Sequence, residues 1–192
     1  MNEPLIENGF AKIGEGSWLV GAAQPTAVIG SVTPRPLKGW LVPDRAKLRL
    51  VEIAGRACCG LTKMPFLTLL PCAAPLTVVS DRVLVAPAAA RQDGKVLRVI
   101  PFSFRNALCV THFTTEWVVL ATASRTTRVP LQENELLTVR VDSAVAWTTK
   151  DPTGFMPRIG LWDILAPRRR ERNLMLHFYG PGVVWMEGSY AS

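Results

Sequence analysis

The sequence has little of what a helical protein or a metalloenzyme requires. No stretch of ten or more residues places apolar side chains at helical spacing behind a capping residue, so helices are not expected to build the fold. Histidine occurs only twice, and neither copy stands in the H-x-H or H-x-D/E pair of a metal oxygenase. G-x-S-x-G elbows, P-loops and Gly-rich dinucleotide turns are also missing. The chain is therefore predicted not to be an enzyme and to hold no cofactor or metal.

Charge is also scarce. Charged residues make up only 19% of the chain, below the ~25% typical of globular domains, which suggests that much of the surface is hidden in contacts. The charges that are present number 22 basic against 15 acidic, a net charge of +7. This balance favours acidic partners, namely nucleic acid or an anionic membrane surface, although a role in solubility alone would also account for it.

Long hydrophobic runs are absent, because every apolar stretch is broken by proline or a charged residue, and no membrane span is expected. The first ten residues carry Glu3 and Glu7 and lack a basic region before an apolar core. They resemble neither a secretory signal nor a mitochondrial transit peptide. A cytoplasmic location is expected, with a mitochondrial one as the alternative if a targeting segment has been removed.

Cysteine is present without any spacing typical of zinc or of a C-x-x-C redox motif. The four residues are a vicinal pair and two distant thiols: Cys58, Cys59, Cys72 and Cys109. They are predicted to be reduced, buried and apolar in character. A redox or metal-binding role for Cys58 and Cys59 is the alternative.

Short runs rich in Val, Leu, Thr and aromatic residues are what the chain does contain, with Pro, Gly, Asn or Asp breaks about every ten residues. Five such runs stand out: 96–102, 106–113, 116–123, 136–141 and 143–149. This rhythm is typical of an antiparallel β-sandwich or small barrel. The fold class predicted is all-β.

A faint repeat indicates two similar halves. Residues 136–141 alternate apolar and polar side chains, and Asp142 and Ser143 then form a polar corner before another apolar run. Residues 75–87 show the same order of strand, Ser-Asp corner and strand. We therefore predict an N-terminal β half over 1–90 and a C-terminal β half over 91–192. Residues 88–95 would be the connecting loop, with its turn at Asp93-Gly94.

The chain ends on two apolar runs, 174–179 and 183–186, around Gly180-Pro181-Gly182, a pattern that predicts a hairpin. The second arm is apolar at every position, so both of its faces must be covered. The domain core would cover one face; a loop, the sister half or another subunit would cover the other. We expect a homo-oligomer, a trimer or ring, with burial inside one chain as the alternative. The expected contacts are Val183, Val184, Trp185 and Met186.

The C-terminal half resembles the altered-inheritance-of-mitochondria family of the superfamily similar to the tryptophan RNA-binding attenuation protein (TRAP-like). Three motifs carry this resemblance: an acidic-x-Leu-x-Val step, a small-residue corner before Val-Ala, and a closing Gly-Pro-Gly-x-Val-Trp. They fall on Glu135, Leu137 and Val139; on Ser143, Val145 and Ala146; and on Gly180, Pro181, Gly182, Val184 and Trp185. The resemblance implies a TRAP-like double-stranded β-helix or β-sandwich, often duplicated in tandem and assembled into trimers or rings. It implies no catalytic residue, and a structural or binding role in a family of largely uncharacterised function.

A basic stretch departs from this family pattern and suggests an alternative role as an RNA-binding regulatory protein. The candidate phosphate contacts are arginines: Arg168, Arg169, Arg170 and Arg172, together with Arg125 and Arg128 around a predicted hairpin turn. A solvated loop, with its arginines paired to Asp163 and Glu171, would also explain the stretch. A further alternative is a metal-dependent cupin-like enzyme, which would need His112 and His177 to meet across strands.

Overall fold

The computed structural model describes residues 3–21, 26–35, 48–60, 64–98, 107–155 and 174–188. Nearly all of the secondary structure in these ranges is antiparallel β-strand, and the one 3₁₀ turn among them is Ser80–Arg82. The all-β fold class is therefore confirmed.

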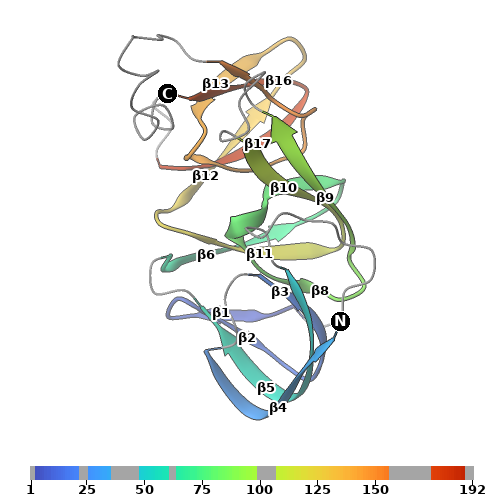
Figure 1. The fold of residues 1–192 in the computed structure, drawn as a ribbon. Helices are drawn as coiled ribbons and strands as arrows, with labels where there is room; N and C mark the ends of the chain where they lie inside the picture. The colour runs from blue at the N-terminus through green and yellow to red at the C-terminus, as the bar shows by residue number, and fades with distance from the viewer. Residues whose placement is uncertain are drawn as a thin grey trace, which may run out of the picture. The chain divides into compact units, whose positions relative to one another are not determined.

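The chain divides into two compact units (Figure 1). Unit 1 comprises residues 1–95 and 109–125, and unit 2 comprises 96–108 and 126–192. The units differ from the sequential halves 1–90 and 91–192 chiefly because residues 109–125 belong with the N-terminal unit.

Unit 1 is dominated by one strongly curled antiparallel sheet of order β1-β2-β5-β3-β8-β11-β6, with β4 on the other edge of β5. β7 pairs with β10 in the same unit. The strands are β1 (Leu5–Glu7), β2 (Phe10–Ile13), β3 (Gly16–Val20), β4 (Ala27–Arg35), β5 (Arg49–Cys59), β6 (Phe66–Pro71), β7 (Leu76–Val79), β8 (Val83–Pro87), β10 (Ala107–Thr114) and β11 (Trp117–Thr122). β9 (Arg91–Arg98) lies where the chain first passes from unit 1 to unit 2.

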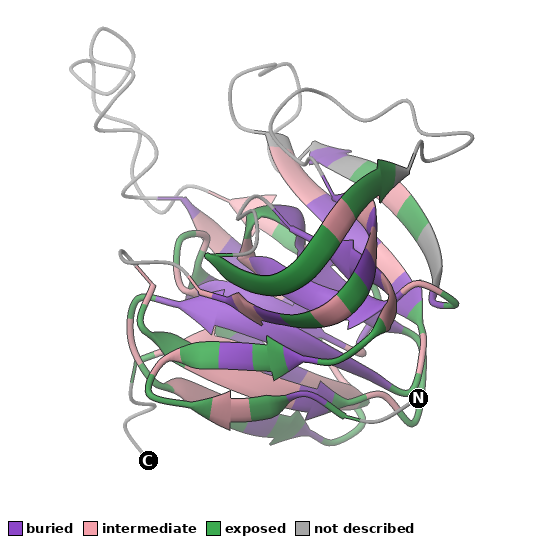
Figure 2. Cartoon of the chain, turned by 90° about the horizontal axis from the view of Figure 1, so that it is seen from below, coloured by how far each residue is buried: buried purple, intermediate pink, exposed green. Residues whose placement is uncertain are grey.

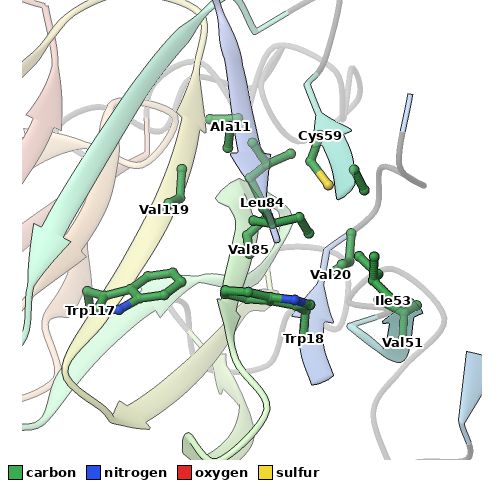
Figure 3. Close-up of a cluster of buried hydrophobic side chains, with 13 residues drawn as sticks. Ala11, Trp18, Val20, Val51, Ile53, Cys59, Leu84, Val85, Trp117 and Val119 are labelled. Carbon is green, nitrogen blue, oxygen red and sulfur yellow. The ribbon is translucent and has the colours of Figure 1, made fainter. Parts of the chain in front are cut away.

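The core of unit 1 is formed by buried side chains from these strands (Figure 3). Trp18 and Trp117 lie next to each other, with ring centroids 5.8 Å apart, and the Trp18 Nε1–H donates to the Gly14 carbonyl at 3.0 Å. Around them pack Ala11, Ile13, Val20, Val51, Ile53, Ala57, Cys59, Leu84, Val85, Val119 and Ala121.

The β4–β5 ribbon needs two glycines. Gly30 and Gly55 are cross-strand partners with φ of +123° and +124°. A Cβ on Gly30 would lie 1.9 Å from the Ala54 carbonyl oxygen, and one on Gly55 would lie 2.1 Å from that of Ile29. Only glycine allows the two backbones to approach this closely. The ribbon is curved, and β4 is exposed along most of its length (Figure 2).

Unit 2 contains two small antiparallel groups, β12-β17-β14 and β13-β16-β15. The strands are β12 (Thr126–Leu131), β13 (Leu136–Arg140), β14 (Ala144–Trp147), β15 (Thr153–Phe155), β16 (Met175–Tyr179) and β17 (Gly182–Glu187). As predicted, β13 alternates: Leu137 and Val139 are buried, and Thr138 and Arg140 are exposed. The corner at 141–143 then leads into β14, which is buried throughout.

Two predictions about turns were wrong. The runs 174–179 and 183–186 form β16 and β17, which join different sheets instead of one hairpin. Gly180 allows this corner, because a Cβ there would lie 1.8 Å from the Gln132 carbonyl oxygen. Asp93 and Gly94 lie inside β9, and the turn comes earlier, where the Ala90 N–H donates to the Pro87 carbonyl at 3.0 Å. In both places tertiary pairing overrides the local turn signal.

The same five-stranded motif occurs once in each unit. We call β6, β7, β8, β10 and β11 copy 1, and β12, β13, β14, β16 and β17 copy 2. In both copies the second strand pairs with the fourth, and the fifth lies between the first and the third. In both copies the register of the fifth strand against the third shifts by skipping one residue of the third strand, Leu84 in β8 and Val145 in β14. The sequence repeat over 75–87 and 136–148 falls on β7–β8 and β13–β14.

Candidate interaction surface

β17 is paired along both edges, with β12 on one side and β14 on the other. Val184 is fully buried on the core side, whereas Val183, Trp185 and Met186 are half-buried. Since alternate side chains of a strand point to opposite faces, Val183 and Trp185 lie on the face away from Val184. Apolar side chains therefore occupy both faces of this strand.

The outer face of β17 continues onto β12. Arg128 is the cross-strand partner of Trp185, and Pro130 is the partner of Val183. Directly opposed side chains lie on the same face of a sheet, and both β12 residues are exposed. Trp185, Val183, Arg128 and Pro130 therefore form one surface, here named the β17 patch. Arg128 lies within the strand and not beside a hairpin turn, so that part of the prediction was wrong.

Hydrogen bonds hold β17 in place at both ends. The Val183 N–H donates to Thr148 Oγ1 and the Thr148 N–H donates to the Val183 carbonyl, each at 2.9 Å. At the other end the Thr127 hydroxyl donates to the Gly188 carbonyl at 2.5 Å. The patch is thus carried by a paired strand with fixed neighbours, which suits a preformed contact surface.

The predicted basic residues are only partly described. Arg125 lies exposed in the turn before β12, and within the described residues neither it nor Arg128 forms an ion pair. Arg168, Arg169, Arg170 and Arg172 lie outside the described residues. The structure therefore brings one predicted anion contact, Arg128, together with one predicted oligomer contact, Trp185.

A hollow of about 370 Å³ adjoins the β17 patch at the corner between β12 and β13. The corner is rigid, because the Gln132 N–H donates to the Glu135 carboxylate at 2.6 Å and Asn134 takes a positive φ of 67°. The hollow is lined by Thr127, Arg128, Val129, Pro130, Leu131, Glu135, Leu136 and Leu137.

A second apolar surface of unit 2 was not predicted. Leu136 and Tyr179 are cross-strand partners on β13 and β16 and are 51% and 53% exposed. Beside them His177 stacks on Phe155, with ring centroids 4.0 Å apart and planes 11° apart, and Thr138 Oγ1 lies 3.0 Å from His177 Nδ1. We name this outer side of β13-β16-β15 the His177 face. The sequence feature that could have pointed to this surface is the His-Phe pair, which occurs at both 112–113 and 177–178.

The two histidines hold equivalent positions in the two copies. His112 is the partner of Thr77, with Nδ1 2.7 Å from the threonine hydroxyl, and His177 has the same relation to Thr138. Each ring thus hydrogen-bonds a cross-strand threonine of its own unit. Among the described residues there is no group of three or more His, Cys, Asp or Glu side chains able to hold a metal ion.

All four cysteines are free thiols, and Cys59 is the one that is fully buried. Burial raises the pKa of Cys59 to about 12 and that of Cys72 to about 11. Both thiols therefore stay protonated at neutral pH, the inert form of cysteine. Half-buried Cys58 lines a separate hollow of about 650 Å³ in unit 1, beside Lys12, which forms an ion pair with Glu7.

Comparisons with known proteins bear on the fold. No family model matches the chain, and no curated protein matches it. The crystal structure of protein SPYM3_0169 from Streptococcus pyogenes is similar, with a TM-score of 0.68 over 94% of this chain and 87% of that one, at 11% sequence identity. At this identity the likeness concerns the fold alone. Within the described residues no helix is long and apolar enough to cross a bilayer.

Proposed function

We propose that this chain is a non-enzymatic structural or binding protein that assembles with copies of itself, as the TRAP-like, altered-inheritance-of-mitochondria resemblance implies. The observation that carries the proposal is the β17 patch, where Val183 and Trp185 occupy the face of a strand paired on both sides, opposite its buried Val184. A large aromatic side chain on such a face contributes most when a partner covers it.

Native mass across a range of protein concentrations tests the proposal. Wild-type protein should sediment as a closed oligomer, and Trp185→Lys should lower the mass while the far-ultraviolet circular dichroism stays that of the wild type. Trp185→Phe keeps an apolar ring and is the matched control, so its mass should equal that of the wild type. A single-chain mass for the wild type at every concentration would refute the proposal.

Binding of single-stranded RNA is the second candidate, favoured by one observation. Exposed Arg128 stands opposite the Trp185 ring, and exposed Arg125 precedes it by three residues. Cationic side chains that bind phosphates beside an aromatic ring that stacks on bases are the usual elements of a single-strand site. Arg168, Arg169, Arg170 and Arg172, the other predicted phosphate contacts, lie outside the described residues.

Titration of labelled RNA at several salt concentrations tests this candidate. Affinity should fall with salt, and the slope should lessen by roughly 0.7 for each phosphate contact removed in Arg125→Ala with Arg128→Ala. Replacing Arg168, Arg169 and Arg170 by alanine should weaken binding further without changing the native mass. Wild-type protein that binds no RNA even at low salt would exclude the candidate.

A further inference from the structure

We draw no further inference here: the strongest candidate, the hollow of about 650 Å³ lined by β2, β4 and β5 in unit 1, has its lysine, Lys12, paired with Glu7 and its arginine, Arg56, offset by the negative charge of Glu15, and among the described residues nothing beside the lone thiol of Cys58 points to a ligand.

Discussion

Copy 1 and copy 2 share strand pairings and register but differ in what surrounds them. β7 is buried at all four positions, whereas β13 is buried at alternate positions only. The threonine–histidine pair is present in both, half-covered in one and on an open face in the other. The difference teaches that strand pairing defines the motif, while the exposure of its outer side depends on what covers it. Substitutions at equivalent positions can therefore separate the two contributions.

Truncation of the buried phenylalanine should give the largest effect. Phe113 and Phe178 are equivalent and both fully buried. Phe113→Ala and Phe178→Ala should each lower the free energy of unfolding by ~3–5 kcal/mol, as measured by denaturant titration. Similar losses would support equal cores in the two copies; a loss below about 1 kcal/mol in either variant would break the equivalence.

The corner before the fifth strand should respond differently in the two copies. Gly180 has no room for a side chain, since a Cβ would meet the Gln132 carbonyl oxygen at 1.8 Å, whereas copy 1 has half-buried Thr115 at the corresponding place. Gly180→Ala should cost ~1–3 kcal/mol, and Thr115→Ala should stay within about 0.5 kcal/mol. Thermal unfolding of both variants measures this contrast. A neutral Gly180→Ala would mean that the corner can move.

The hydrogen bond between threonine and histidine should contribute more to the free energy of unfolding in copy 1, where the threonine is buried, than in copy 2, where it is exposed. Thr77 is 6% exposed and its hydroxyl lies 2.7 Å from His112 Nδ1, whereas Thr138 is exposed. Thr77→Val removes the buried hydroxyl that partners the half-buried His112 ring and should cost ~1–2 kcal/mol. Thr138→Val should cost less than about 0.5 kcal/mol in the dissociated protein, because water replaces the hydroxyl. Equal costs in chemical denaturation would contradict the difference in burial.

Ionisation of cysteine at alkaline pH should destabilise unit 1 alone, since all four cysteines lie there. The pKa of Cys59 is raised to about 12 in the folded chain, against about 8.5 in an unfolded one. The raised pKa of Cys59 gives its full contribution to the stability of the folded chain when the pH is below the pKa of the thiol in the unfolded chain. This contribution is lost as the pH rises toward 12, because the thiol of the unfolded chain releases its proton first. At pH 9 the loss should be about 0.5–1 kcal/mol, measured as the change in unfolding free energy from pH 7. Cys59→Ala should abolish this part of the pH dependence; an unchanged dependence in that variant would rule out Cys59 as its source.

Local patterns were enough to predict the strands but not their partners. The alternation over 136–141 and the polar corner at 142–143 follow from side chains that must face either core or water. The prediction of a closing hairpin was wrong because the residues Gly180-Pro181-Gly182 are compatible both with a turn within one sheet and with a corner between two sheets. The His177 face was missed because Phe155 and His177 are far apart in sequence and meet only through the β15–β16 register. Trp185 could be selected as a contact residue since its whole arm is apolar, but its neighbour Arg128 comes from a strand pairing that no spacing reveals.

Sedimentation equilibrium of the wild-type chain at micromolar concentration tests the central claim most directly. The account predicts the mass of two or more chains of 21.1 kDa each, and a lower mass for Trp185→Lys under the same conditions. A wild-type mass of one chain would contradict it.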